Sequence, residues 1–156
     1  MQLIIAGDLV PTKSNIEHFS KGNMDMLLGD ELFSLWGSAN MRMFNLESPI
    51  TNTFSPISKC GPNFMAPTST IKGIKALNPS LIALANNHIL DQGEQGLHST
   101  VRLLEENDIA YVGAGSNLVE AARPYIWERD GIRVGVYACA EHEFTIATED
   151  SPGANP

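Results

Sequence analysis

Apolar residues along this chain come in short runs that alternate with helix-like segments. Five runs are nearly continuous in apolar residues and are bounded by Gly, Pro, Asn or Asp: residues 3–6, 41–44, 81–85, 110–112 and 134–138. Such runs are typical of buried parallel strands. In addition, an Asp-Gly pair separates residues 125–129 from residues 133–137, which predicts an antiparallel β-hairpin at that place.

Helical periodicity fills the intervals between the earlier strands. Residues 93–106 place leucines and a valine at helical spacing, which predicts an amphipathic helix. Ser69 is expected to cap a second helix that Asn78 and Pro79 end, and shorter helices are expected over residues 31–36 and 118–122. The alternation of strand and helix predicts an α/β layered fold with one mostly parallel sheet, helices and a hairpin.

The length and the composition indicate one domain, or part of one. With 156 residues, of which 43% are hydrophobic, the chain can bury a sizeable core but not two. Residues 48–68 contain four prolines and a glycine with little periodicity, which is typical of a long binding loop or lid. The two cysteines are far apart and form no C-x-x-C pattern, so neither a disulfide framework nor a zinc knuckle is expected.

The charge and the hydropathy pattern exclude two classes of partner. Ten basic and 18 acidic residues give a formal net charge of −8, which disfavours binding to nucleic acid. No run approaches the roughly 20 apolar residues of a membrane helix, and no signal peptide is recognisable at the start. We therefore expect no membrane segment in this chain, while its localisation stays open.

Polar residues follow the first four predicted strands, at the point where each strand ends. They are Asp8, the pair Asn45 and Glu47, the triplet Asn86-Asn87-His88, and the glycine turn at residues 113–115. In an open parallel α/β sheet these carboxyl ends share one edge, where ligands bind. The four clusters are therefore expected to converge.

The residue types at these strand ends suit a divalent cation. Asp8 and Glu47 supply anionic oxygens, and Asn87 can supply a carbonyl oxygen. Two neighbouring carboxylates repel each other unless a cation lies between them. We therefore predict a metal site at this edge, to which Asp8, Glu47 and Asn87 supply oxygens, while His88 can supply an imidazole nitrogen or act as an acid or base.

Simpler explanations exist for some of these residues. Asp8 alone could close a turn after the first strand, and Glu47 could be an exposed loop acid. The consecutive amides before His88 would need several hydrogen-bond partners merely to be satisfied, which favours a functional site there. Asp91 is expected to cap the helix that begins near Gly93.

Three further positions are candidates for contact with a substrate. Asn45, Asn86 and Gly115 stand at the predicted edge, and the glycine turn could offer backbone N–H groups to an anion. A tight strand-to-helix turn is the interpretation that we favour for Gly115. Glu141 and His142 form a possible rim, although charged residues at a strand end are more often only solvated.

Four motifs together resemble a known family. "AGDLVPT", "FNLESPIT", "LANNHILDQGEQGLHST" and "YVGAGSNLVEAARPYI" occur in the order and spacing of the CapA family, which are bacterial poly-γ-glutamate capsule biosynthesis proteins of the calcineurin-like metallophosphoesterase superfamily. The resemblance implies a layered α/β sandwich with a divalent metal site at the sheet edges. It also implies that Asp8 is the first ligand, Glu47 takes the place of the bridging acid, Asn87 is the amide ligand and His88 is the acid/base histidine.

The chain also departs from that family. Family members are longer and carry a late H-x-H pair, which is absent here. Residues 1–156 therefore resemble the N-terminal half of a CapA-like domain, which we expect to be inactive by itself. A missing second sheet would leave an apolar face exposed, so we expect self-association or pairing with the C-terminal half.

Two functions follow as expectations. The first is capsule or poly-γ-glutamate biosynthesis through metal-dependent hydrolase chemistry, with Mn, Mg, Zn or Fe as the ion and an acidic polymer or a phosphoester as substrate. The second is a non-catalytic binding subunit for an acidic polymer or a synthase complex. A fold alone does not decide between them.

Overall fold

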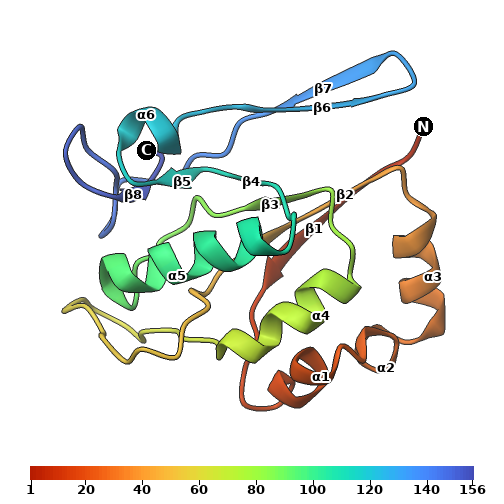
Figure 1. Cartoon of the computed structure of the whole chain (residues 1–156), viewed down its shortest axis with the longest axis horizontal. Helices are drawn as coiled ribbons and strands as arrows, with labels where there is room; N and C mark the ends of the chain where they lie inside the picture. The colour runs from red at the N-terminus through yellow and green to blue at the C-terminus, as the bar shows by residue number, and fades with distance from the viewer.

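A four-stranded parallel sheet lies at the centre of the computed structural model, which describes all 156 residues (Figure 1). Its strands follow one another in chain order: β1 (Leu3–Leu9), β2 (Met41–Leu46), β3 (Leu81–Ala83) and β4 (Tyr111–Val112). All three pairings are parallel, as the apolar runs predict. The α/β fold class is therefore confirmed, and the arrangement is compatible with part of a metallophosphoesterase-type sandwich.

The predicted hairpin is also confirmed, but the fifth apolar run is not a buried parallel strand. β6 (Tyr125–Arg129) pairs antiparallel with β7 (Ile132–Val136). Asp130 and Gly131 make the turn with φ of 52° and 75°, the left-handed conformation that a tight hairpin needs. Residues 134–138 were expected to be buried on both faces, whereas β7 alternates between exposed and half-buried positions because only one of its faces meets the sheet.

The helices are mostly short. They are α1 (Ile16–Lys21), α2 (Met24–Leu28), α3 (Asp30–Ser38), the 3₁₀ turn η1 (Thr68–Thr70), α4 (Ile71–Ala76), α5 (Gly93–Glu106) and α6 (Leu118–Ala121). α5 has the bounds that the periodicity predicts. Ser69 does not cap α4: it lies inside η1, and its hydroxyl meets the Ser20 hydroxyl of α1 at 2.8 Å. The two remaining strands, β5 (Ala114–Gly115) and β8 (Gly153–Ala154), pair antiparallel.

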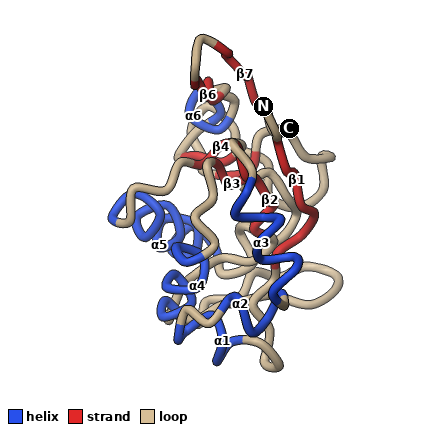
Figure 2. Tube along the Cα trace, turned by 90° about the vertical axis from the view of Figure 1, so that its right-hand side faces the viewer, coloured by secondary structure: helices blue, strands red, loops and turns tan.

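The core lies on both faces of the sheet. Alternate strand residues point to opposite faces, so Phe44 packs with the helices and Met41 packs with the hairpin. The larger cluster includes Phe19 of α1, Ile74 of α4 and Leu97 of α5. Figure 2 shows the resulting order of layers, with the hairpin at one end, the sheet in the middle and α1, α2 and α4 at the other end.

β1 forms one edge of the sheet and contains an irregularity close to its end. Ile5 pairs with Met43 and Asp8 pairs with Asn45, so β1 spends three steps where β2 spends two. Such a bulge turns the side chains that follow it, and bulges occur often beside active sites. The extra residue therefore determines the direction in which the Asp8 side chain points from the sheet.

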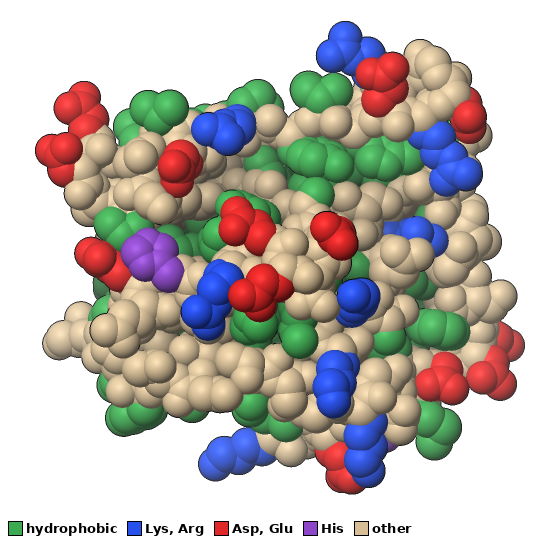
Figure 3. All heavy atoms as spheres, viewed as in Figure 1, with side chains coloured by type: hydrophobic (Ala, Val, Ile, Leu, Met, Phe, Trp, Pro, Cys, Tyr) green, Lys and Arg blue, Asp and Glu red, His purple; other side chains and the backbone are tan.

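The surface carries charged side chains of both signs and two exposed cysteines. Figure 3 shows acidic and basic side chains on the same face, with several of the basic ones gathered below its centre. Cys60 and Cys139 are exposed and unpaired, as expected. None of the helices combines the length and the apolar character that a membrane crossing requires.

Candidate functional site

A relay of amides joins the carboxyl ends of the first three strands. The Asn45 amide donates to the Asp8 carboxylate at 2.8 Å, and the Asn86 amide donates to the Asn45 carbonyl at 3.0 Å. Asn86 also donates to the Leu46 carbonyl at 2.9 Å and accepts from the His88 backbone N–H at 3.0 Å. The residues predicted at three strand ends are thus brought together by direct hydrogen bonds.

Glu47 lies beside Asp8 at this edge. It is half-buried rather than an exposed loop acid, and burial is the main reason why its pKa is raised above the ordinary value of 4.5. The neighbouring Asp8 carboxylate raises the pKa of Glu47 further, through its negative charge and its close approach to the Glu47 carboxyl group. His88 acts in the opposite direction and lowers the pKa of Glu47.

Asn87 and His88 complete the set of residues predicted from the strand ends. The Asn87 side chain makes no hydrogen bond within the chain, and only its backbone carbonyl is engaged, by the Lys59 ammonium at 3.4 Å. The His88 ring is 12% exposed, and its Nδ1 lies 2.6 Å from Oδ2 of Asp91. No three His, Cys, Asp or Glu side chains of the chain are grouped so as to hold a metal ion by themselves.

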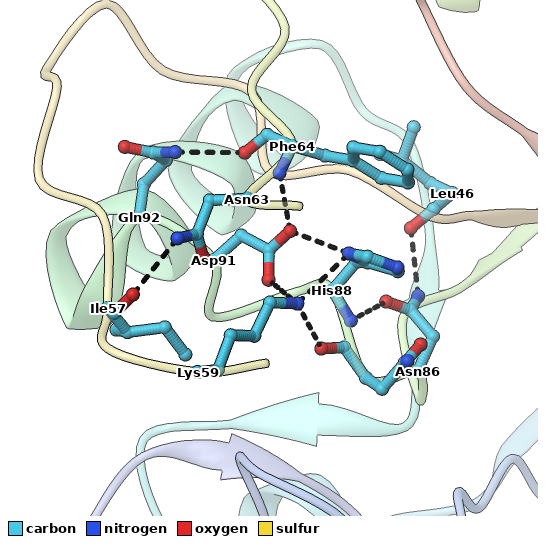
Figure 4. A network of polar contacts seen from close by, with 10 residues as sticks. Leu46, Ile57, Lys59, Asn63, Phe64, Asn86, His88, Asp91 and Gln92 are labelled. Atoms are coloured by element: carbon cyan, nitrogen blue, oxygen red, sulfur yellow. Dashed lines mark hydrogen bonds and ion pairs between the residues drawn. The ribbon is translucent and has the colours of Figure 1, made fainter. Parts of the chain in front are cut away.

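Asp91 has a different role from the one expected. It does not cap α5, because the position before that helix is Gln92 and no side chain caps it. The fully buried Asp91 carboxylate instead accepts from the Phe64 backbone N–H at 2.5 Å and meets both His88 and the Lys59 ammonium (Figure 4). Its Oδ1 makes no hydrogen bond of regular geometry, so Lys59 neutralises that oxygen by contact.

The proline-rich loop is attached to the same turn. The Ile57 N–H donates to the Asp91 carbonyl at 3.1 Å, and Gln92 bonds to Ser55 N–H and to the Phe64 carbonyl. The Phe64 ring stacks on the His88 ring, with centroids 4.0 Å apart and planes 16° apart. The loop therefore forms one wall of the site.

The remaining predicted residues lie farther from this cluster or are used by the fold. Gly115 is buried in β5, where an added Cβ would lie 2.5 Å from the Cβ of Glu120, so the close turn into α6 requires glycine. Glu141 and His142 are exposed, and His142 lines a hollow near the end of the chain with Phe144. Contact of Asn45, Asn86 and Gly115 with a substrate, and a rim formed by Glu141 and His142, stay predictions.

Lys59 and Phe64 are the site residues that sequence reasoning missed. Lys59 is the sole basic residue of the proline-rich loop, and its side chain is only 2% exposed. A lone lysine in a loop ordinarily stays in solvent. The one available signal was the excess of acidic and polar groups at residues 86–92, which would need a cation if buried.

The Asp8 charge gives the first testable prediction. Asp8→Asn should lower the pKa of Glu47, although not to 4.5, because burial remains the larger cause. Because the pKa of Glu47 is raised in the folded state, Glu47 contributes stability that is fully present below pH 4.5. This contribution is lost as the pH rises through the folded-state pKa. In Asp8→Asn, the loss of stability with rising pH should therefore be smaller. NMR titration of the Glu47 carboxyl carbon measures the pKa directly.

The control is Asp130→Asn in the hairpin turn, which should leave the Glu47 pKa unchanged. An unchanged Glu47 pKa in Asp8→Asn would contradict the proximity of the two groups.

Comparison with the sequences of known proteins shows the family of this chain. The model of the family described as "Bacterial capsule synthesis protein PGA_cap" matches residues 2–156. The capsule biosynthesis protein CapA of Bacillus anthracis is 33% identical over 91 residues, which is 57% of this chain and 22% of that protein. A "probable polyglutamine synthesis accessory protein" of Mycobacterium tuberculosis is 40% identical over 81 residues, 52% of this chain and 21% of that protein.

A third relative gives the same result. The PGA biosynthesis protein CapA of Bacillus subtilis is 26% identical over 90 residues, which is 56% of this chain and 24% of that protein. The matched stretches thus span less than a quarter of each relative's own length. Because the family model covers almost the whole chain, the resemblance predicted from the four motifs is confirmed. This chain belongs to the CapA family of bacterial capsule synthesis proteins.

Proposed function

We propose that this chain supplies part of a divalent-metal centre for hydrolase chemistry in capsule or poly-γ-glutamate biosynthesis. The observation that carries the proposal is that the Asp8 carboxylate, held by the Asn45 amide, lies close enough to Glu47 to raise the pKa of that carboxyl group, at the end of the relay that leads through Asn86 toward Asn87. Oxygen donors of this kind suit Mn²⁺, Mg²⁺, Zn²⁺ or Fe²⁺. The printed names of the relatives, which refer to capsule and polyglutamine synthesis, support the biological setting.

The donor set fits such an ion as a partial coordination shell. Two carboxylates that repel each other gain most from a cation between them, and the amide relay keeps Asp8 in place through Asn45. Since the chain groups no third His, Cys, Asp or Glu with them, the other positions would be filled by water, by substrate or by further polypeptide. A bound ion would polarise the substrate and activate a water molecule.

His88 would act as the acid or base beside that ion. Its Nδ1 is engaged by Asp91, and its Nε2 makes no hydrogen bond within the chain. The stacked Phe64 ring restricts rotation of the imidazole. An imidazole held by one nitrogen and free at the other can exchange a proton with a reacting group. An ion at Asp8 and Glu47 would also attract the acidic polymer or phosphoester that the −8 charge otherwise repels.

Metal binding by this chain tests the proposal. Mn²⁺ added to the protein should lose its free-ion EPR signal, and Asp8→Asn or Glu47→Gln should each weaken binding by about 10-fold or more, because each removes a donor. His88→Ala should bind Mn²⁺ as the unaltered protein does, because His88 is not a ligand. The control is Asp130→Asn, which removes an equal charge elsewhere. Equal weakening by Asp130→Asn and by the two donor variants would mean that Mn²⁺ only follows the net charge, and an unchanged affinity in Asp8→Asn and Glu47→Gln would contradict the proposal.

We also propose that the open edge of the sheet is covered by further polypeptide in the working protein. β1 has a strand on only one side, and Ile5 in its middle is 72% exposed. Ile4 and Ala6 of β1 line a hollow of about 580 Å³ with 14 lining residues, of which 11 are hydrophobic, among them Leu27 and Leu32 of α2 and α3. An unpaired strand edge with apolar neighbours pairs readily with another chain. In the isolated chain the available partner is a second copy.

Self-association is therefore expected. Sedimentation velocity should show a larger species that grows with protein concentration. Ile5→Lys should restore the monomer, because a charge on an edge strand blocks edge-to-edge pairing. Ile126→Lys, at a 47% exposed position of the hairpin, is the matched control and should associate like the unaltered protein. A monomer at every concentration, or equal dissociation by both variants, would exclude association through β1.

A further inference from the structure

Asp91 is the centre of a buried ionic cluster that the proposed metal site does not use. The Asp91 side chain is fully buried and the Lys59 side chain is 2% exposed, so neither charge is solvated. A buried ion pair is tolerable only when its members neutralise each other and their remaining groups are hydrogen-bonded. In this cluster Oδ2 of Asp91 accepts from the Phe64 N–H at 2.5 Å and faces the His88 ring at 2.6 Å, while Oδ1 is neutralised by its contact with the Lys59 ammonium.

The two oxygens of Asp91 have separate partners. Oδ1 contacts the Lys59 ammonium, and Oδ2 faces Nδ1 of His88 (Figure 4). An ionised carboxylate has no proton to donate, so an imidazole nitrogen 2.6 Å away must itself carry the hydrogen. The hydrogen-bond network therefore assigns the Nδ1–H tautomer to neutral His88 and leaves the lone pair of Nε2 free.

Lys59 also lies 3.2 Å from Nδ1 of His88, and a competing arrangement is therefore possible. If the ammonium donated to Nδ1, the ring would carry its hydrogen on Nε2 instead. The shorter and charge-assisted contact with Asp91 decides against this. Lys59 has other partners, because its ammonium pairs with the charge of Oδ1 of Asp91 and donates to the Asn87 carbonyl at 3.4 Å.

We propose that Lys59 is a positioning residue that sets the tautomer of His88. Its ammonium occupies one oxygen of Asp91 and keeps that carboxylate ionised in a buried place, which reserves the other oxygen for the Nδ1–H group of His88. A buried carboxylate without a counter-ion takes up a proton. Asp91 would then donate to Nδ1, and the hydrogen of His88 would move to Nε2. Through Lys59, the proline-rich loop determines whether Nε2 accepts or donates.

The inference deepens the proposed role of His88 and rests on it for its functional meaning, but its test does not involve the metal. ¹⁵N spectra of the imidazole rings at about pH 8, where an ordinary histidine is neutral, distinguish the protonated nitrogen from the unprotonated one. His88→Gln assigns the signals of His88. The other three histidines of the chain serve as internal references.

The unaltered protein should show a protonated Nδ1 and an unprotonated Nε2 at His88. Lys59→Met should exchange the two signals, whereas Lys59→Arg, which keeps the charge, should retain the original pattern. Lys72→Met, at an exposed lysine of α4, should leave the spectrum unchanged. An Nε2–H tautomer in the unaltered protein would refute the proposal without any variant, and so would a folded Lys59→Met protein that keeps Nδ1–H.

A second variant covers the case in which Lys59→Met does not fold. Lys59→Met combined with Asp91→Asn removes both buried charges together, which buried pairs tolerate better than the loss of one partner. His88 should then show a mixture of both tautomers, and a pure Nδ1–H form would overturn the proposal. If the ¹⁵N spectra are as expected but the protein does not bind Mn²⁺, only the proposal of a metal centre is refuted. The two proposals can therefore fail separately.

Discussion

The parallel register of β1, β2 and β3 is the constraint on which the site depends. It pairs Asp8 with Asn45 in the sheet and places Asn86 just beyond the end of the next strand. The amides of Asn45 and Asn86 then carry that alignment into side-chain hydrogen bonds that end on the Asp8 carboxylate. A slip of one residue would send each of these side chains to the other face of the sheet. The geometry of the edge is thus inherited from the core that holds the strands in register.

A second constraint acts from the opposite side of the site. The fully buried Asp91 carboxylate draws together a lysine, a backbone N–H and an imidazole from two segments that are far apart in sequence. An isolated charge is costly inside a protein. If the loop that carries Lys59 moved away, the Asp91 carboxylate would stay buried without its counter-ion. The proline-rich loop is therefore bound to the site by electrostatics, although it has hardly any regular secondary structure.

Much of this arrangement could be predicted from the sequence because it depends on local patterns. The apolar runs, the periodicity of residues 93–106 and the Asp-Gly turn predict their elements correctly, and parallel topology then implies that the strand ends meet. The role of Asp91 could not be found in this way. Its partner Lys59 is 32 positions away in an irregular loop, and a local rule for helix caps gave the wrong role. The prediction of a buried parallel strand at residues 134–138 was wrong, because an apolar run alone does not distinguish a strand buried on both faces from a hairpin strand buried on one.

The proposal of an ion at the sheet edge is tested most directly by the distribution of a paramagnetic ion. Mn²⁺ broadens the NMR signals of nearby nuclei, so the asparagine side-chain amides report where it resides. The amide signals of Asn87, Asn45 and Asn86 should broaden first. Those of Asn40, which bonds to Gln2 at the opposite end of the sheet, and of Asn107 at the end of α5 should stay sharp. Uniform broadening, or broadening that begins at Asn40 or Asn107, would show that no cation site exists at the carboxyl ends of these strands.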